Sequence, residues 1–365
     1  MKSFTALILS LITCCGVLAA GQAGPDNTPP SDIPAFVQQL EALRIAANIP
    51  GLSVVVVQDQ AVVLALGLGY ADPGRRVPAT AETPYDIASV AKPLSAVVAL
   101  RLAEQGVLDL DRPMADYSDW AGFCADFSQQ PSIFAKGLNC QPPVHTLRHL
   151  LSHTATRVPG SRFSYNPVLY SWASRPIMAA ADTPFSALVE KYVFAPAGMT
   201  KSARKHRGLA LRDDLAMQLA PPHQIAASGA IERSPAMSPQ GDGAAGGVVS
   251  TVLDLARFDI ALDQGKLLSA ASRKIMLSAS LSNDGQVLPY GVGWFVQQYQ
   301  GHTLVWHSGW WENAYSALYL KVPAQNLSFI VLANSEGIWW NNPLTGAEVQ
   351  RSGFAQAFLQ SFVTD

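Results

Sequence analysis

The sequence has 365 residues, of which 49% are apolar and 14% are charged, and its formal net charge is -2. A chain of this length and composition can bury a large core, so a disordered protein is excluded. The charge balance creates no field that would attract phosphate backbones or anionic lipid. Nucleic acid is therefore not an expected partner.

The chain begins with MKSFTALILSLITCCGVLAAGQAG, which combines one lysine, an apolar run and small residues. This pattern is typical of a secretory signal peptide rather than of a membrane-spanning helix. We expect a signal over residues 1–23 and an exported protein, periplasmic or secreted. A lipoprotein signal that uses Cys14 or Cys15 is the alternative, although Thr13 is an unusual neighbour for a lipid-modified cysteine.

Cys124 and Cys140 lie outside the predicted signal. In an exported protein they would pair, and the closed loop would stabilise the fold by roughly 3 kcal/mol in the chain-entropy model. The alternative is two buried free thiols. We expect the disulfide.

Strand patterns occur near both ends of the chain. Residues 35–48 have helical spacing, and residues 51–72 contain two β-branched runs around Gln58, Asp59 and Gln60, which predicts a hairpin. The C-terminal third predicts further strands and a last helix. The strand-length segments are 288–298, 302–307, 315–322 and 327–335, and the helical spacing covers 353–363.

The middle of the chain is mainly helical in pattern, interrupted by proline and glycine, and has no internal repeat. The simplest fold is α/β (α+β), with one antiparallel sheet built from both chain ends and flanked by helices. We predict a sheet domain of residues 24–112 and 246–365, with residues 113–245 inserted as a helical domain. A pocket would form between the two.

Ser89 and Lys92 stand three residues apart in TPYDIASVAKPLSAVVALRLAEQG. Pro93 is tolerated only in the first turn of a helix, so the predicted helix begins near Ser89. There, backbone donors and the helix dipole would stabilise an oxyanion, and a lysine of lowered pKa could accept the serine proton. The alternative is an N-cap serine beside an exposed lysine.

The same spacing recurs at Ser202 and Lys205, in MTKSARKHR. The charges around this copy predict a solvated surface turn. We expect no catalytic role for it.

Seven segments occur in the order seen in the serine β-lactamase-like group, which includes class C β-lactamases, DD-peptidases, D-aminopeptidases and related esterases. They are IPGLSVVVV, TPYDIASVAK, LAEQGVLDLDRPM, TLRHLLSHTA, AAGGVVSTVLDLARF, YGVGW and WHSG. The chain resembles this group from about residue 35 onwards. The resemblance implies the serine β-lactamase/DD-peptidase-like fold and acyl-enzyme chemistry without a cofactor, with Ser89 as nucleophile and Lys92 as its proton acceptor.

The resemblance also points to Tyr165 as the partner base and leaving-group acid. In the group an asparagine follows this tyrosine two residues later, but here Pro167 holds that place and Asn166 comes one place early. Asn166 is the candidate for binding substrate, and the shifted register puts the direction of its amide in question.

The third element of the group, Lys-Thr-Gly, corresponds to His307, Ser308 and Gly309, which we expect to bind substrate. The amide of Trp310 would then complete an oxyanion hole with the amide of Ser89. A histidine is mostly neutral at pH 7, whereas a lysine is charged. A substrate carboxylate should be held less firmly, which favours esters or small amides.

Four tryptophans, Trp310, Trp311, Trp339 and Trp340, follow or accompany this element near the end of the chain. As walls of the site they would suit an apolar acyl or alcohol group. Tryptophans that pack in the hydrophobic core are equally common, so the sequence leaves both interpretations open.

His145, His149 and His153 fall four residues apart, a spacing that could present three imidazoles to a zinc ion. No acidic residue or cysteine completes a convincing ligand set, so we predict no metal.

Two further interpretations compete for the function: a non-catalytic penicillin-binding-like sensor or binding module, and a true β-lactamase or DD-peptidase. Ser89, Lys92, Tyr165 and Gly309 are all present, which argues for catalysis. We favour an exported serine hydrolase that acts on a small-molecule ester, amide or β-lactam-like substrate.

Overall fold

The computed structural model describes residues 32–117, 119–141, 145–226, 228–235 and 237–364. The predicted signal peptide, with Cys14 and Cys15, lies outside these residues. Among the helices in the described part of the chain, none is long and apolar enough to cross a membrane.

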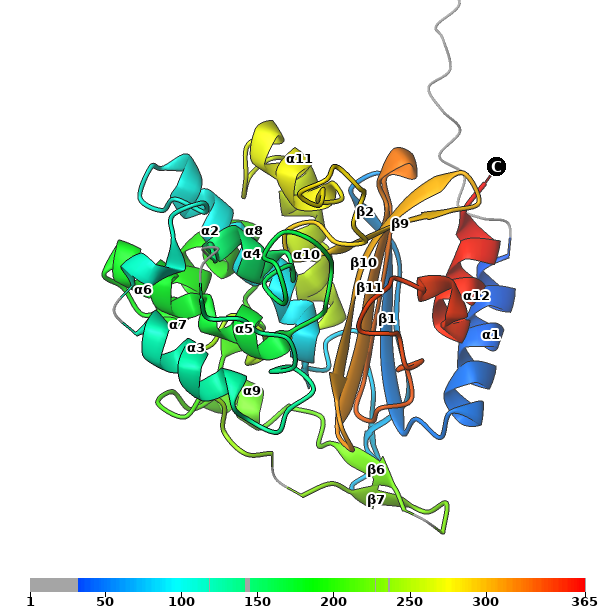
Figure 1. Ribbon diagram of the computed structural model, residues 1–365. Helices are drawn as coiled ribbons and strands as arrows, with labels where there is room; N and C mark the ends of the chain where they lie inside the picture. Colours follow the sequence, from blue (N-terminus) through cyan, green and yellow to red (C-terminus); the bar gives the residue numbers. More distant parts are fainter. Residues whose placement is uncertain (1–31, 118, 142–144, 227, 236, 365) are drawn as a thin grey trace, which may run out of the picture.

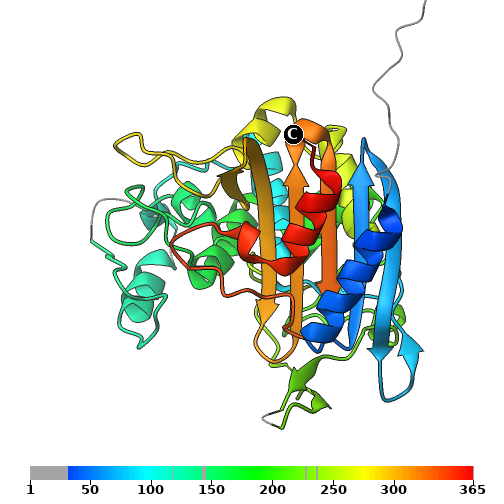
Figure 2. The ribbon, with the colours of Figure 1, turned by 90° about the vertical axis from the view of Figure 1, so that its right-hand side faces the viewer.

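A seven-stranded antiparallel sheet stands at the centre of the fold, in the order β3-β2-β1-β12-β11-β10-β9 (Figures 1 and 2). Strand β1, near the start of the chain, pairs with β12, near its end, with Leu52 opposite Ala333. The prediction of one sheet built from both chain ends is therefore confirmed. The strands are β1 (Gly51–Gln58), β2 (Ala61–Asp72), β3 (Val77–Pro78), β9 (Phe295–Tyr299), β10 (His302–Trp311), β11 (Tyr315–Val322) and β12 (Leu327–Ala333).

Helices cover both faces of the sheet. Helices α1 (Ile33–Ala46) and α12 (Gly353–Phe362) lie side by side on one face, as Figure 2 shows. Phe329 of the sheet stacks on Phe358 of α12 at 4.9 Å between ring centroids, so aromatic packing fixes this layer. The opposite face carries α2 (Ala91–Glu104) and α10 (Val252–Asp263) (Figure 1).

Shorter helices and a small sheet complete the side of α2 and α10, and a separate hairpin lies below the end of the central sheet (Figure 1). The helices are α3 (Trp120–Ser128), α4 (Leu147–Leu151), α5 (Pro167–Trp172), α6 (Ser174–Ala181), α7 (Phe185–Val189), α8 (Ala195–Ala197), α9 (Asp213–Ala216) and α11 (Ala270–Leu277). The strands are β4 (Tyr85–Asp86), β5 (Ala203–Arg204) and β8 (Val248–Ser250), which form a small sheet, and the hairpin of β6 (His223–Ile225) and β7 (Ile231–Arg233).

The hairpin predicted over residues 51–72 is confirmed. Strand β1 ends at Gln58 and β2 begins at Ala61, and the two residues between them, Asp59 and Gln60, have φ of 49° and 63°. Two consecutive positive φ angles match the twist of the flanking strands, which is why two-residue hairpin turns favour them.

The strand predicted over residues 288–298 is shorter than expected, because β9 begins only at Phe295. The segment before it packs against α2. At Gly293, φ is 84°, and a Cβ would stand 2.7 Å from the Cβ of Ala96. This close approach to a helix takes the segment out of the sheet.

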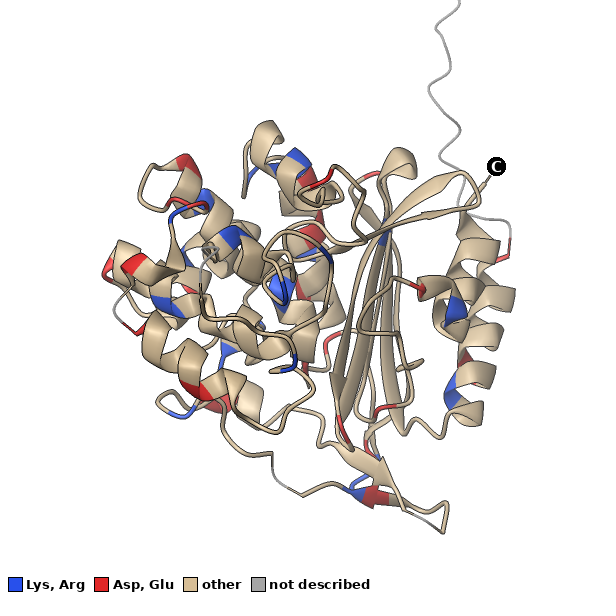
Figure 3. Cartoon of the chain, in the orientation of Figure 1, with Lys and Arg blue, Asp and Glu red and all other residues tan. Residues whose placement is uncertain are grey.

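Residues 113–245 carry α3 to α9 on the side of the sheet that α2 and α10 cover (Figure 1). The boundaries of the two predicted domains stay a prediction. Basic and acidic residues are interspersed over these helices (Figure 3), in keeping with the small net charge of the chain.

Cys124 and Cys140 form the predicted disulfide, with their Cα atoms 5.8 Å apart and a sequence separation of 16. The bond ties α3 to the irregular segment that follows it.

Removing both sulfurs by the double substitution Cys124→Ala and Cys140→Ala should lower the free energy of unfolding by about 3 kcal/mol, because the unfolded chain regains the entropy of the open loop. Urea unfolding of the two proteins measures the difference. Wild-type protein reduced with dithiothreitol keeps all side chains and should match the double variant. Equal stability of the oxidised and reduced wild type would contradict the prediction.

Candidate active site

Ser89 and Lys92 lie together at the start of α2. Ser89 sits in a 3₁₀ turn (Ala88–Val90), and α2 begins at Ala91, which confirms that the helix starts beside this serine with Pro93 in its first turn. The Nζ of Lys92 is 2.7 Å from the Oγ of Ser89. The two groups are within hydrogen-bonding reach, the arrangement that proton transfer from a nucleophile requires.

A buried carboxylate holds the turn that carries Ser89. Asp86 accepts the backbone N–H of Ala88 at 2.9 Å, and the indole N–H of Trp311 at 3.0 Å, on the same oxygen. Its other oxygen pairs with the Nζ of Lys205 at 2.9 Å. Ala88 has a φ of 47°, an unusual value for a residue with a side chain, so Asp86 stabilises a conformation that the backbone alone would resist.

Lys92 is fully buried, with 0% of its surface exposed. Burial lowers the pKa of its amine well below the ordinary value, because desolvation disfavours the charged form. Besides Ser89, the amine contacts the carbonyl oxygen of Ala245 at 3.2 Å. An uncharged amine at this place has a lone pair available for the proton of Ser89.

Tyr165 lies close to both Ser89 and Lys92, and the Nζ of Lys92 is 5.1 Å from the centroid of the tyrosine ring. Burial raises the pKa of the Tyr165 phenol, and the Ser89 side chain offsets part of that rise. The phenol is therefore protonated at neutral pH. This protonation suits a proton donor, whereas Lys92 suits the base.

The third predicted element lies on β10, next to Ser89. A Cβ at Gly309 would stand 2.3 Å from the carbonyl oxygen of Ile87, so only glycine lets the strand approach this turn. The approach brings the backbone that follows Gly309 beside Ser89, as an oxyanion hole formed by the amides of Ser89 and Trp310 requires. Ser308 lines the pocket in front of Ser89.

His307 does not reach the pocket, contrary to the expectation that it binds substrate. It is fully buried, its Nδ1 is 2.7 Å from the carbonyl oxygen of Ser308 and its Nε2 is 3.0 Å from the hydroxyl of Tyr290. Burial lowers the pKa of His307 well below its usual value, and the proximity of Lys92 lowers it further. The neutral imidazole of His307 thus stabilises β10 through these two contacts.

Asn166 also lies away from the pocket. Its side-chain amide donates to the carbonyl oxygen of Phe134 at 2.7 Å, and its side-chain oxygen accepts the N–H of Leu169 at 3.0 Å as the cap of α5. Because both ends of the amide are occupied and buried, we leave Asn166 out of the site. The shift in register, with Pro167 as the first residue of α5, has turned this residue into a helix cap.

A pocket of about 580 Å³ opens in front of Ser89. Its walls come from several parts of the chain that sequence analysis did not assign, and most of the side chains are aromatic or aliphatic. The lining residues include Phe134, Val168, Gln240, Phe295, Glu312 and Leu344, together with the predicted Ser89, Tyr165, Ser308, Trp310, Trp311 and Trp339. Trp340 instead packs beside Trp306 at 5.4 Å, away from the pocket.

A glycine-rich stretch, residues 241–247, forms one wall of this pocket. A Cβ at Gly243 would stand 1.9 Å from the hydroxyl of Ser171, so this stretch needs glycine to lie so close. The buried Arg204 donates to the carbonyl oxygen of Gly243 at 2.9 Å and pairs with Asp242 at 2.8 Å. The run of glycines in the sequence was the available signal for this close packing.

The second Ser-x-x-Lys copy is a structural element and not the solvated surface turn that its charges predicted. Ser202 is buried and donates to Asp254 at 2.7 Å, and Lys205 pairs with Asp86 beneath the turn of Ser89. The prediction failed because sequence alone does not show that the neighbouring acids lie in the interior.

His145, His149 and His153 do not converge on a metal. The Nε2 of His145 is 2.8 Å from the carbonyl oxygen of Ala155, and His149 accepts the backbone N–H of Thr146 at 3.1 Å. His153 lies beyond the end of α4 and accepts the N–H of Asn166 at 3.0 Å. In the described residues, no group of three or more histidines, cysteines or acids could hold a metal ion.

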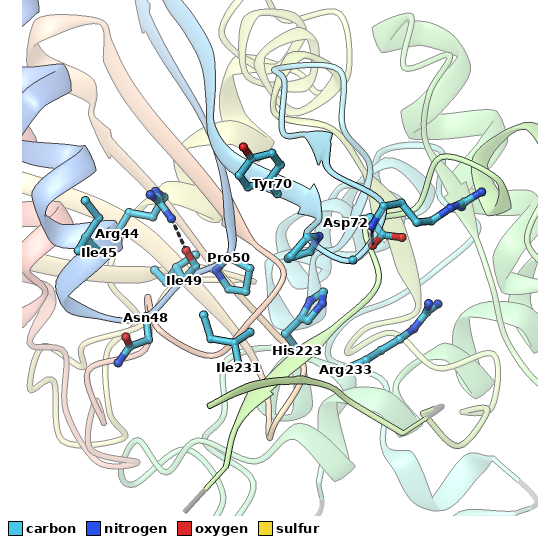
Figure 4. A pocket seen from close by; sticks show the side chains of 13 residues that line it. Arg44, Ile45, Asn48, Ile49, Pro50, Tyr70, Asp72, His223, Ile231 and Arg233 are labelled. Atoms are coloured by element: carbon cyan, nitrogen blue, oxygen red, sulfur yellow. Dashed lines mark hydrogen bonds between the residues drawn. The ribbon is translucent and has the colours of Figure 1, made fainter. Parts of the chain in front are cut away.

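A second hollow of about 610 Å³ lies between the end of α1, strand β2 and the β6–β7 hairpin (Figure 4). Arg44, Tyr70, His223 and Arg233 are among its lining side chains. None of the described residues that line it is a serine, threonine or cysteine, and none of them lines the pocket of Ser89. The candidate nucleophile Ser89 therefore makes the pocket in front of it, and not this hollow, the candidate active site.

The Beta-lactamase family profile matches residues 35–339. The chain belongs to the Beta-lactamase family. Protein flp of Staphylococcus aureus is 24% identical over 312 residues, which cover 79% of this chain and 60% of flp. The chain thus spans about three fifths of the length of this relative.

Several solved structures share the fold. The octameric penicillin-binding protein homologue from Pyrococcus abyssi has a TM-score of 0.72 at 22% identity, over 90% of this chain and 77% of its own. D-amino acid amidase from Ochrobactrum anthropi SV3 has a TM-score of 0.67 at 19% identity, over 90% of this chain and 99% of its own. EstCE1, described as a hydrolase with promiscuous acyltransferase activity, has a TM-score of 0.67 at 19% identity, over 89% of this chain and 97% of its own. At these sequence identities, structural similarity shows that the proteins share a fold.

Replacing Lys92 by methionine should raise stability while it removes activity. The folded-state pKa of Lys92 lies well below the value of about 10.4 for an exposed lysine, so below that pH the unfolded chain binds this proton more tightly than the folded chain, which penalises folding. Without that penalty, the free energy of unfolding at pH 7 should rise by about 0.5 to 2 kcal/mol. The gain should vanish as the pH passes above about 10.4, where both states are neutral.

Urea unfolding at several pH values measures this difference. The matched control is Lys266→Met, because Lys266 is exposed and should change neither stability nor activity. A Lys92→Met protein that is less stable than the wild type at pH 7 would show that the amine is charged and paired when folded.

Proposed function

We propose that this protein is an exported serine hydrolase that cleaves esters or small amides through an acyl-enzyme at Ser89. The observation that carries the proposal is the 2.7 Å contact between the Ser89 hydroxyl and the fully buried amine of Lys92, at the floor of an open pocket. Among the described residues the Lys92 amine contacts Ser89 and Ala245 and pairs with no carboxylate, and a buried lysine in such a place is costly for a fold. A role as general base accounts for its presence here.

In the first step the Oγ of Ser89 attacks the substrate carbonyl carbon, and the serine proton passes to the Nζ of Lys92. The new oxyanion would lie between the amides of Ser89 and Trp310, where the close approach of β10 at Gly309 supports such a site. The proton then moves, by way of the Tyr165 phenol, to the leaving alcohol or amine as its bond to the carbonyl carbon breaks.

In the second step water attacks the acyl-enzyme and Ser89 regains its proton. Lys92 and Tyr165 again handle the transfer, because the groups that protonate the leaving group in one direction deprotonate water in the other. The neutral amine and the protonated phenol that burial favours are the states with which the cycle starts.

The lining of the pocket favours substrates without a carboxylate. No lysine or arginine is among the described residues that line it, and the His307 that replaces the lysine of the family motif is buried out of reach. A β-lactam or a D-alanyl terminus would bring a carboxylate with no cation to meet it. The aromatic walls suit an apolar acyl or alcohol group.

Export is supported by the signal-like start of the sequence and by the disulfide between Cys124 and Cys140. Disulfides persist in oxidising compartments and are rare in the cytosol.

A panel of p-nitrophenyl esters, D-alanine amide and nitrocefin, assayed on one preparation, tests the proposal. We expect the p-nitrophenyl esters, which have an activated leaving group, to be cleaved fastest, and nitrocefin, which carries a carboxylate, slowest. Ser89→Ala should lose at least about 10³-fold in kcat/KM on every substrate that the wild type cleaves, whereas the exposed Ser278→Ala should keep full activity.

Turnover that survives in Ser89→Ala would overturn the assignment of the nucleophile. If the wild type forms a stable adduct with a fluorophosphonate but cleaves none of the panel, the protein is a binding module of the same fold and the proposed hydrolysis is wrong.

A further inference from the structure

The pocket of Ser89 has an aromatic wall, which we define as Trp310, Trp311 and Trp339. Trp310 and Trp339 stack at 5.9 Å between ring centroids with 22° between their planes, and Trp310 is 40% exposed. Indole faces that remain open to a pocket offer electron-rich surfaces to a ligand.

Carboxylates surround this wall. Glu312 is the one charged side chain among the described residues that line the pocket. Behind the wall, the indole N–H of Trp310 donates to Glu336 at 3.0 Å, and that of Trp311 donates to Asp86 at 3.0 Å. The hydrogen bond to Glu336 adds to the negative potential of the Trp310 indole, whereas the charge of Asp86 is offset by its ion pair with Lys205.

The cations nearby do not compensate this potential at the pocket. Lys205, in the neighbouring hollow beside Trp311, is paired with Asp86 at 2.9 Å. Lys92 is buried beneath Ser89, where burial lowers its pKa and favours the neutral amine. The pocket therefore combines three indole side chains in its lining with the negative charge of Glu312, a combination that binds organic cations.

We propose that the aromatic wall and Glu312 bind an alkylammonium group, so that the substrates are esters or amides that carry a positive charge near the scissile bond. The inference rests on the proposed function, since it names the substrate class for the same pocket. A quaternary or primary ammonium would contact the indole faces, with Glu312 supplying the opposite charge. A carboxylate at the same place would face repulsion from Glu312.

Two molecules of almost equal shape separate charge from size. Acetylcholine carries a trimethylammonium group, and 3,3-dimethylbutyl acetate carries a tert-butyl group in its place. We use the Ser89→Ala protein, in which neither is consumed, and measure both dissociation constants by calorimetry. Acetylcholine should bind about ten-fold more tightly, as expected for a cation on tryptophan faces with one carboxylate.

Two substitutions test which residues cause the preference for the charged molecule. Glu312→Gln should reduce the preference for the charged molecule to about three-fold, and Trp339→Leu should weaken acetylcholine more than its neutral analogue. The matched control is Glu232→Gln, an exposed glutamate on β7 that does not line the pocket, which should leave the preference unchanged. Equal affinity for the two molecules, or tighter binding of the neutral one, would overturn the proposal.

Cleavage assays of the same two esters with the wild-type protein distinguish a failure of this inference from a failure of the proposed hydrolysis. If the charged ester binds selectively to Ser89→Ala but the wild type cleaves no ester, cation recognition stands and the proposed function falls. If the wild type cleaves both esters at equal kcat/KM and binding shows no preference, the hydrolase stands and cation recognition falls.

Discussion

The fold buries the Lys92 amine beside a serine hydroxyl, which lowers the pKa of the amine, and most features of the site follow from that constraint. Lys92 is buried on every side: Ser89 lies above it, Tyr165 and Tyr170 flank it with ring centroids 5.1 and 5.4 Å from its Nζ, and Ala245 closes the floor. Water around this amine would bring its pKa back towards the ordinary value. The close packing around α2 thus lowers the pKa of the candidate base, at a cost to stability.

Several parts of the chain meet to exclude that water. Glycines at positions 293 and 309 let the C-terminal part of the chain lie against α2 and against the turn of Ser89. Arg204 holds residues 241–247 so that the carbonyl oxygen of Ala245 faces Lys92. Asp86 connects the turn of Ser89, Trp311 and Lys205, so the candidate nucleophile and one wall of the pocket are held by the same carboxylate.

Local patterns in the sequence predicted the features that depend on local physics. Proline in the first turn of α2, the hairpin at Asp59 and Gln60 and the disulfide needed only spacing and residue type. Tertiary contacts decided the rest. His307 and Asn166 have the residue types of a binding site, yet their hydrogen bonds turn them into supports, and Lys205 pairs with Asp86, which lies far earlier in the sequence. Glu312 and the walls from residues 241–247 and 339–344 meet Ser89 only through the folding of distant segments.

The most direct test of this account is the pKa of the Lys92 amine itself. Protein labelled with ¹⁵N and ¹³C at lysine allows the Nζ and Cε resonances to be followed with pH, and the signal that disappears in Lys92→Met belongs to Lys92. The account predicts that this amine loses its proton at a clearly lower pH than the exposed lysines do. A Lys92 resonance that stays protonated up to the pH range of the exposed lysines would contradict it.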